Sequence, residues 1–321
     1  MTRPSRATII LAFAAVYVIW GSTYLAIRYA IETLPPFLMA ASRFLVAGVI
    51  LFTWARLRGE KAGLSFAQWR HAFVIGALLL ACGNGGVTWA ERSIASGLTA
   101  LLVATEPLWV VILNWILTRK RPNATVLLGV LIGLGGVALL VSGSNFIHGS
   151  GGSVKRLAGA GVVVAAAFAW ASGSVYASRH PLKATTSIAS GTQMLAGGSL
   201  LLLLALAFGD FKRLSFAGAS WVSIAALFYL ILFGSLVGFT AYSFLLRNVT
   251  PANAATYAYV NPVVAVLLGW LIASEPLTWR MLLAAAVIVG SVVLITRFGG
   301  EHAAAATAEG HDSECPTLPC A

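Results

Sequence analysis

Long runs of hydrophobic residues, separated by short polar or proline-containing breaks, fill the chain from about residue 8 to about residue 297. A membrane-spanning helix needs about 20 predominantly apolar residues, and each run has about that length. A β-barrel would instead show short segments of alternating hydrophobicity. The pattern therefore predicts an all-α polytopic membrane protein with ten transmembrane helices. We place these helices at residues 8–30, 36–55, 71–90, 94–118, 124–143, 157–178, 185–208, 219–246, 252–273 and 278–297.

The polar breaks divide the chain into two halves and a tail. A linker rich in Gly and Ser at 144–156 separates residues 1–143 from residues 157–297, and each half contains five predicted helices. Residues 298–321 are mostly small and polar, so we expect a disordered tail. The first apolar run is too long for the hydrophobic part of a signal peptide, and we interpret it as an uncleaved first span.

The second half repeats features of the first at a shift of 155 positions. Pro107 then corresponds to Pro262, and Trp115 corresponds to Trp270. Because each half has an odd number of predicted helices, the second half would enter the membrane with the opposite orientation. Two inverted five-helix repeats around a central cavity are typical of alternating-access transporters.

Composition agrees with a lipid environment and excludes several classes of protein. Of the 321 residues, 59% are hydrophobic and only 10% are charged, which rules out a soluble globular enzyme and a disordered or fibrous chain. The net charge of +11 would suggest nucleic-acid binding in a soluble protein, but Lys and Arg in cytoplasmic loops account for it here. Thirteen Lys and Arg lie at the helix ends that include both termini, against seven at the opposite ends, so we predict cytoplasmic termini.

Two segments carry a resemblance to a known family. The stretch from Trp20 to Arg28, WGSTYLAIR, resembles the opening signature of EamA-type carriers of the drug/metabolite transporter superfamily. The stretch YAYVNPVVAVLLG from Tyr257, followed by SEPL from Ser274, resembles the signature of the ninth helix in that family. The similarity covers about residues 8–297 and is greatest to the YedA-like and YddG-like bacterial inner-membrane exporters. It implies two EamA repeats of five helices, a central cavity and export of small metabolites.

Polar side chains recur along one face of the predicted ninth helix. Asn253, Tyr257 and Asn261 are spaced i, i+4 and i+8, so they form one stripe. Such a stripe can face a substrate, or it can form hydrogen bonds between helices. We favour the cavity, because polar side chains that face lipid are costly.

Aromatic side chains form a comparable face on the first predicted helix. Tyr17, Trp20 and Tyr24 are spaced i, i+3 and i+7, and a face of this kind can stack on a ring or hold an ammonium group. The alternative is a belt of aromatic residues at the membrane interface. Trp170 and Tyr176 are the counterparts in the second half and share both interpretations.

A few further polar groups lie inside predicted spans. Asn84 and Thr88 share a helix face, and Glu106 is an acidic residue well inside the fourth span. A buried carboxylate is costly, so Glu106 is a candidate proton acceptor or ammonium partner. Arg43 in the second span could pair with Glu106, bind a carboxylate through its guanidinium fork, or extend towards the outer face.

The motifs that are absent narrow the chemistry. The sequence contains no P-loop, no metal-ligand spacing within the spans and no recognisable catalytic cluster, so we expect no cofactor, no metal and no enzymatic activity. His302, His311, Cys315 and Cys320 crowd the tail, where a solvated segment is favoured over a metal site.

Together these observations predict a secondary transporter of the bacterial inner membrane that exports small amphipathic metabolites. Amino acids lead as the substrate class, aromatic or large apolar ones first, because the candidate residues combine rings with neutral amides. An exporter of cationic drugs is the alternative, and an intramembrane enzyme is disfavoured. The expected partners are a small molecule and the lipid bilayer, without nucleic acid. The sequence does not set the oligomeric state, and a monomer is compatible with it.

Overall fold

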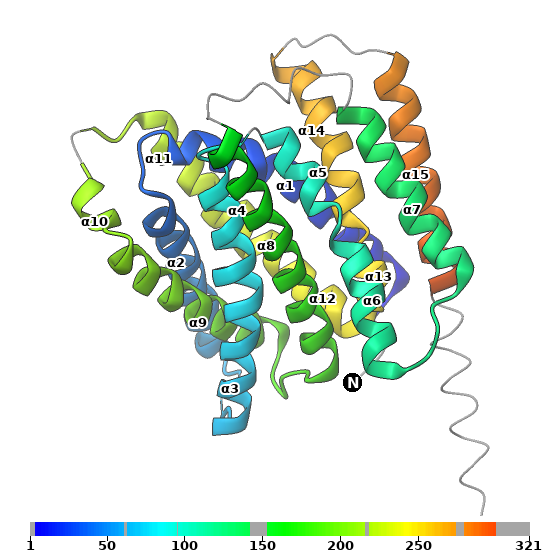
Figure 1. Ribbon diagram of the computed structural model, residues 1–321. Coiled ribbons are helices and arrows are strands. Elements are labelled where there is room, and N and C mark those ends of the chain that lie inside the picture. Colours follow the sequence, from blue (N-terminus) through cyan, green and yellow to red (C-terminus); the bar gives the residue numbers. More distant parts are fainter. Residues whose placement is uncertain are drawn as a thin grey trace, which may run out of the picture.

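The computed structural model of the chain describes residues 4–60, 63–94, 96–141, 153–215, 218–273 and 279–299. Every regular element within these ranges is a helix, and the helices lie side by side in one bundle (Figure 1). The prediction of an all-α polytopic protein is therefore confirmed for the described part of the chain.

Six helical stretches among the described residues are long and apolar enough to cross a membrane. They are α1 (Arg6–Ile31), α2 (Pro36–Leu57), the stretch Phe66–Ala90, the stretch Leu157–Arg179 within α8 (Ser153–Arg179), α9 (Thr186–Ala207), and the stretch Trp221–Asn248. Residues 153–156, which we expected in the linker, belong to α8. Linker residues 144–152 and tail residues 300–321 lie outside the described residues.

The other helices are shorter or are separated by turns. They are α5 (Ser96–Val103), α6 (Glu106–Thr118), α7 (Ala124–Val141), α10 (Asp210–Arg213), α13 (Pro251–Ala254), α14 (Tyr257–Ala273) and α15 (Trp279–Gly299). The ranges 94–118 and 252–273 were each expected to be one helix, and both are interrupted. Pro107 has no N–H to continue the hydrogen bonds of α5, and the Thr256 hydroxyl donates to the carbonyl of Asn253 at the second break.

Two of the long stretches contain a π-helical segment at corresponding positions. Phe66–Ala90 consists of α3 (Phe66–Ile75), η1 (Gly76–Asn84) and α4 (Gly85–Ala90), and Trp221–Asn248 consists of α11 (Trp221–Tyr229), η3 (Leu230–Phe239) and α12 (Thr240–Asn248). The shift of 155 places η1 on residues 231–239, which is η3 almost residue for residue. Segments with π-helical hydrogen bonds are found frequently at functional sites.

A glycine in each π-helical segment allows close approach of a tryptophan from the other half. A Cβ atom at Gly83 would lie 2.7 Å from Trp170 Cε3, and one at Gly238 would lie 2.5 Å from Trp20 Nε1. Any larger side chain at these two positions would therefore displace an indole ring. The two glycines are themselves 155 positions apart, as the repeat predicts.

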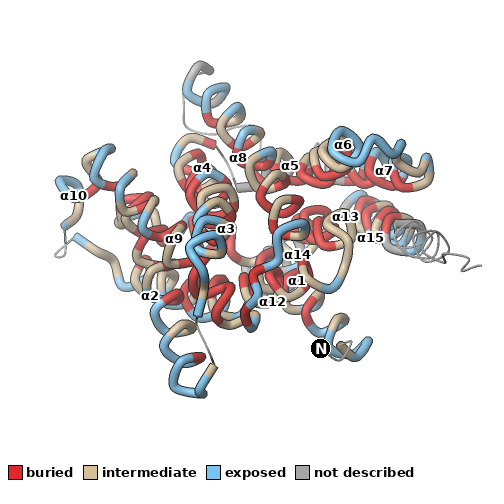
Figure 2. Tube along the Cα trace, turned by 90° about the horizontal axis from the view of Figure 1, so that it is seen from below, coloured by how far each residue is buried: buried red, intermediate tan, exposed pale blue. Residues whose placement is uncertain are grey.

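The helices of the two halves exchange equivalent contacts. Helix α1 packs against α11, η3, α12 and α14, whereas α8 packs against α3, η1, α4, α5 and α6. Helix α2 packs on α9, and α7 packs on α15. These two pairs lie at opposite sides of the bundle, with α1 and α8 between them (Figures 1 and 2). Helices α1 and α8 thus occupy the centre, where each meets helices of the opposite half.

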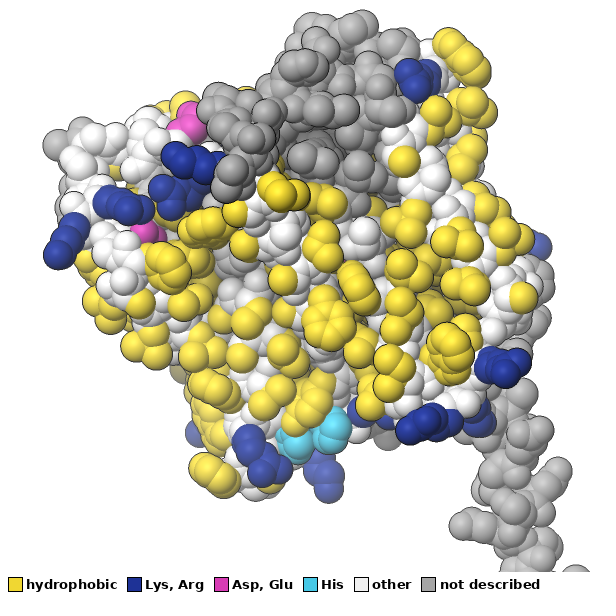
Figure 3. Space-filling model, in the orientation of Figure 1, with side chains coloured by type: hydrophobic (Ala, Val, Ile, Leu, Met, Phe, Trp, Pro, Cys, Tyr) yellow, Lys and Arg dark blue, Asp and Glu magenta, His cyan; other side chains and the backbone are white. Residues whose placement is uncertain are grey.

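The surface of the bundle is suited to lipid. Hydrophobic side chains cover a broad band of the face shown in Figure 3, while Lys and Arg gather along its lower edge and at its upper left. Large apolar side chains such as Val49, Ile50, Leu203 and Phe233 are exposed on the outside of the helices. An apolar belt between two charged rims is the distribution expected of a protein that spans a bilayer.

Candidate functional site

A cavity lies at the centre of the bundle, between α1, α2, η1, α4, α5, α6, α8, η3 and α14. About 630 Å³ of space free of protein atoms lies between these helices, part of which is open to the surroundings. Most of the residues expected to bind substrate line it. They are Trp20, Tyr24, Asn84, Glu106, Trp170, Tyr257 and Asn261.

Three predicted site residues do not line this cavity. The Thr88 hydroxyl donates to the Asn84 carbonyl within its own helix, 2.8 Å away, and Thr88 is fully buried. Tyr176 lies near the end of α8, where its hydroxyl is 2.6 Å from His71 Nδ1. Asn253 lies on the short α13, and the turn before α14 takes it out of the stripe formed by Tyr257 and Asn261. The regular helical spacing that predicted this stripe is interrupted there.

Four aromatic rings are packed together at one side of the cavity. The Trp20 ring centroid lies 5.4 Å from that of Trp170, 5.0 Å from that of Tyr242 and 4.9 Å from that of Tyr257. Trp20 Nε1 donates to the carbonyl of Gly234, and Trp170 Nε1 donates to the Tyr242 hydroxyl. Because both indole N–H groups are hydrogen bonded, the faces of the rings offer an apolar surface for part of a ligand.

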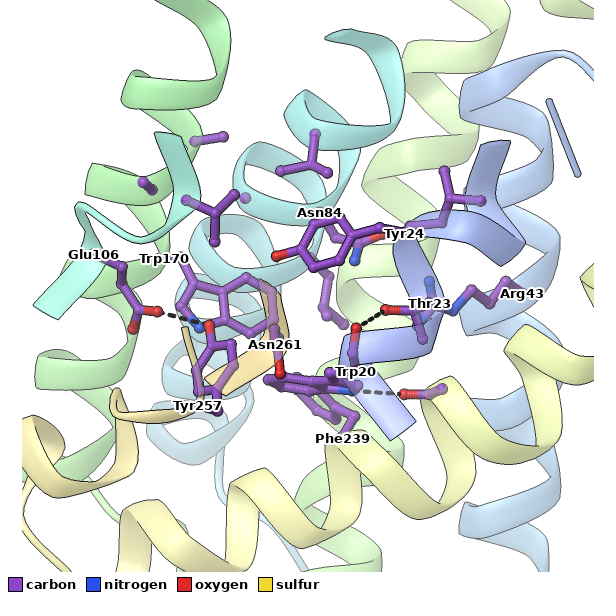
Figure 4. Close-up of a pocket in the computed structure, with 18 of the residues that line it drawn as sticks. Trp20, Thr23, Tyr24, Arg43, Asn84, Glu106, Trp170, Phe239, Tyr257 and Asn261 are labelled. Carbon is purple, nitrogen blue, oxygen red and sulfur yellow. Dashed lines mark hydrogen bonds between the residues drawn. The ribbon is translucent and has the colours of Figure 1, made fainter. Parts of the chain in front are cut away.

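Glu106 is fully buried at the beginning of α6, and its carboxylate faces the cavity (Figure 4). The Tyr257 hydroxyl donates to Glu106 Oε2 across 2.7 Å, while Oε1 is buried without a hydrogen-bond partner. The first turn of a helix favours a negative charge, which partly offsets the cost of burial. One carboxylate oxygen is therefore free to accept a hydrogen bond from a ligand.

Arg43 enters the cavity from the opposite wall (Figure 4). Its side chain is buried, Nε donates to the Ser235 hydroxyl across 2.7 Å, and Nη1 has no partner. The guanidinium carbon lies 4.7 Å from the ring centroid of Phe44. Arg43 is thus buried against Ser235 and Phe44, and the ion pair with Glu106 that was one of its three possible roles is not formed.

Neutral polar groups complete the lining. Asn84 Oδ1 is buried without a partner, and the Asn261 amide can donate to the carbonyls of Tyr17 and Tyr257 at 3.3 and 3.1 Å. The Tyr24 hydroxyl faces the Asn261 side chain. These groups could orient a ligand without adding charge.

Several residues near the cavity escaped the sequence analysis. Phe44 and Phe239 line it, and Tyr242 belongs to the aromatic cluster, but none of them forms a periodic pattern with polar neighbours. Glu91 follows the last residue of α4 and is buried, with neither carboxylate oxygen hydrogen bonded. Glu91 lies in a predicted loop, where acidic side chains are usually solvated, so nothing in the sequence marked it as buried.

The described residues contain no group of three His, Cys, Asp or Glu side chains that could hold a metal ion. The tail residues considered above for a weak site, from His302 to Cys320, lie outside the described part of the chain. The cavity itself offers one carboxylate, one guanidinium and neutral groups, which is a poor set of ligands for a metal but a good one for an organic molecule.

Comparison with known proteins gives concordant matches. The EamA-like transporter family matches residues 7–142 and again residues 157–297. The "Uncharacterized inner membrane transporter YedA" of Escherichia coli (strain K12) is 43% identical over 286 residues, which are 89% of this chain and 89% of YedA. The "Uncharacterized transporter YoaV" of Bacillus subtilis (strain 168) is 24% identical over 90% of this chain and 96% of YoaV. A solved crystal structure has the same fold, with a TM-score of 0.74 and 22% identity over 91% of this chain and 97% of that one.

Proposed function

Because the chain belongs to the EamA-like transporter family and is a multi-pass transporter of the bacterial inner membrane, we propose that it exports small amphipathic metabolites by alternating access. Amino acids with aromatic or large apolar side chains are the leading substrates. The observation that carries this proposal is the composition of the central cavity, where an aromatic cluster lies beside amides and one charged group of each sign.

The exchange of contacts between the halves supports the alternating-access part of the proposal. Helices α1 and α8 meet equivalent helices of the opposite half, and the π-helical segments recur at the same shift as the sequence repeat. We propose ten spans in two inverted repeats, residues 1–143 and 157–297, with residues 144–156 around the connection and both termini cytoplasmic. In such an architecture, rocking of one repeat against the other exposes the central cavity to each side in turn.

An exporter of cationic drugs remains the alternative within transport, because tryptophans and a carboxylate can hold a cation. Arg43 opposes it, since a guanidinium in the same cavity would repel a second positive charge. An intramembrane enzyme is less well supported still, because the lining residues contain no Ser, Cys or Lys nucleophile beside a general base.

Transport by the purified protein in proteoliposomes tests the proposal. Vesicles preloaded with unlabelled phenylalanine or leucine should accumulate the labelled amino acid by exchange, and Trp20→Ala should reduce this uptake strongly. Trp54→Ala, on the exposed outer surface, is the matched control and should transport normally. Exchange of a labelled quaternary ammonium compound without exchange of amino acids would favour the drug exporter, and experiments with and without a pH gradient would identify proton coupling.

A further inference from the structure

We propose that three rings at the predicted cytoplasmic ends of the helices, those of His71, Tyr176 and His180, form a contact between the two halves that loosens when both histidines are protonated. The inference rests on the proposed alternating-access function, because it assigns to this contact the control of access to the cavity from the cytoplasm. None of the three residues lines the cavity itself.

The three rings connect a helix of the first half to a helix of the second half. His71 lies on α3, Tyr176 lies on α8, and His180 follows the last residue of α8. The Tyr176 hydroxyl lies 2.6 Å from His71 Nδ1. The His180 ring is stacked on both others, with its centroid 4.8 Å from that of His71 and 4.3 Å from that of Tyr176. Any movement that separates α3 from α8 at this end must break these contacts.

The cluster is accessible to protons from solution. The His180 side chain is exposed, and those of His71 and Tyr176 are half-buried. Figure 3 shows the histidine side chains (cyan) side by side at the lower edge of the molecule, next to Lys and Arg. Imidazole is the side chain whose charge ordinarily changes between pH 5 and 8. The number of protons on the cluster can therefore follow the pH of the cytoplasm.

The charged side chains around the cluster are positive. Arg70 and Arg179 directly precede the two histidines, and the charge of Arg70 acts on that of His71. Lys183 lies in the turn before α9, and Arg247 of α12 lines a small pocket together with His180. Each of these charges disfavours a further proton on the rings and repels it once it is bound.

Negative charge that could offset a protonated pair is scarce at this end. Among the described residues, only Glu60 is an acidic side chain at the predicted cytoplasmic ends, and it accepts a hydrogen bond from the Thr185 hydroxyl. Of the helices packed against α3 and α8, η1, α4, α5, α9 and α13 contain no Asp, Glu, Lys, Arg or His. Helix α6 carries only Glu106, which faces the central cavity (Figure 4).

Protonation should weaken the contact between α3 and α8 at its second step. With one proton on the pair, the hydrogen bond to Tyr176 persists, because a protonated Nδ1 can donate to the phenol oxygen. A second proton places like charges on the stacked rings of His71 and His180, and separation of the two helices relieves this repulsion. Acidification should therefore favour the state in which the two halves are apart at the cytoplasmic side.

Distances between two spin labels across the contact test this in the full-length protein. In a background with Cys82, Cys315 and Cys320 changed to serine, labels are attached at Ala67→Cys before His71 and at Lys183→Cys after His180, both at exposed positions. We expect the population with the longer distance to increase severalfold from pH 8 to pH 5.5. A distribution of distances that is the same at both pH values would overturn the inference.

Variants that cannot be protonated assign the response to the cluster. In the labelled background, His71→Gln combined with His180→Gln should abolish the pH response. His180→Gln alone should reduce it, because a single charge has no stacked partner. Glu91→Gln is the matched control, since it removes a buried carboxyl at the opposite ends of the helices and should keep the full response. The same response in the double variant as in the parent would contradict the proposal.

Salt provides a second test that keeps the histidines in place, and it applies even if the double variant does not fold. Repulsion between partly exposed charges is screened by ions, so about 1 M sodium chloride should reduce the pH response. A response that is independent of salt would mean that repulsion between the rings does not drive it.

Exchange of labelled phenylalanine in proteoliposomes at pH 8 separates failure of this inference from failure of the proposed function. Exchange together with a distance that does not depend on pH would reject the pH-sensitive contact and keep the function. A distance that depends on pH, with no exchange of phenylalanine or leucine, would reject the amino-acid exporter and keep the contact.

Discussion

Glu91 is the residue whose burial has the clearest consequence outside the membrane-spanning segments. Burial raises the pKa of its carboxyl well above the ordinary value, and the charge of Arg28 opposes this rise only in part. The folded protein therefore retains a proton at Glu91 that the unfolded chain releases. The contribution of this retained proton to the free energy of unfolding is complete below the ordinary carboxyl pKa. It is lost as the pH rises towards the folded-state pKa, by at most about 1.4 kcal/mol per pH unit.

We accordingly expect Glu91→Gln to gain stability relative to the wild type as the pH increases. The glutamine keeps the shape of the protonated acid and cannot ionise, so its melting temperature should exceed that of the wild type by more at pH 8 than at pH 5. Glu32→Gln, on an exposed side chain, should show little change in this difference. A constant difference between Glu91→Gln and the wild type across this range would show that Glu91 does not titrate there.

Single residues differ in how visible they are from the sequence. Glu106 and Arg43 stand out because charged side chains within apolar runs are costly, and both lie in the cavity. Trp20 and Tyr24 stand out through helical spacing. Tyr242 carries no such mark, because its place depends on where η3 and α12 bring it relative to α1. Contacts between distant segments of this kind are not encoded in a local pattern.

At the level of elements, Asp210 connects the two halves through the beginning of a helix. Asp210 Oδ2 accepts hydrogen bonds from the backbone N–H groups of Phe37 and Leu38, at 2.8 and 3.1 Å. These are orphan donors of the first turn of α2, where Pro35 precedes the helix and offers no side-chain cap. A carboxylate from a remote segment thus satisfies the end of α2 and complements its dipole.

Asp210→Ala should lower the free energy of unfolding by about 1–3 kcal/mol, because two buried donors lose a charged acceptor. Asp210→Asn keeps an oxygen acceptor and should be destabilised less. Thermal denaturation in detergent measures both, with Glu32→Ala as the control for loss of an exposed carboxylate. Equal melting temperatures for Asp210→Ala and the control would show that water or another group can cap α2 equally well.

The two π-helical segments determine how closely the tryptophans approach the opposite half. Gly83→Ala should push the Trp170 indole away, and Gly238→Ala should displace Trp20, because the added methyl groups would lie within 3 Å of ring atoms. Each change should alter intrinsic tryptophan fluorescence and reduce affinity for phenylalanine severalfold. Gly161→Ala on α8 is the matched control, since its Cβ meets no atom within 4 Å, and it should bind normally.

Normal ligand binding by Gly83→Ala and Gly238→Ala would mean that the indoles can move without consequence for the cavity.

The elements themselves were only partly predictable. Apolar run length identified the helical ranges, because lipid demands complete internal hydrogen bonding of the backbone. The π-helical hydrogen bonds and the breaks at residues 104–105 and 255–256 depend on packing and on single side-chain hydrogen bonds such as that of Thr256, which run length does not record.

At the scale of the whole molecule, the sequence repeat predicts the contacts between the two halves better than it predicts the cavity. A shift of 155 positions relates both the glycines and the π-helical segments, and the packing of α1 and α8 has the same exchange of partners. The cavity adds something that no repeat contains, because Arg43 and Glu106 are not counterparts of one another. The cavity therefore contains a distribution of charge that the sequence repeat does not predict.

The orientation of the whole bundle in the membrane is predicted only by the count of Lys and Arg at its two sides. Thirteen Lys and Arg lie at the helix ends that include both termini, against seven at the other ends. This bias predicts that the loop of Arg121 lies in the cytoplasm and that Glu32 lies on the outer side. In a background with Cys82, Cys315 and Cys320 changed to serine, a membrane-impermeant thiol reagent should label Glu32→Cys in intact spheroplasts and Arg121→Cys only after permeabilisation. Both side chains are exposed, so access to the reagent depends on the side of the membrane and not on burial. The reverse labelling pattern would invert the orientation, and with it the direction in which the cavity delivers its substrate.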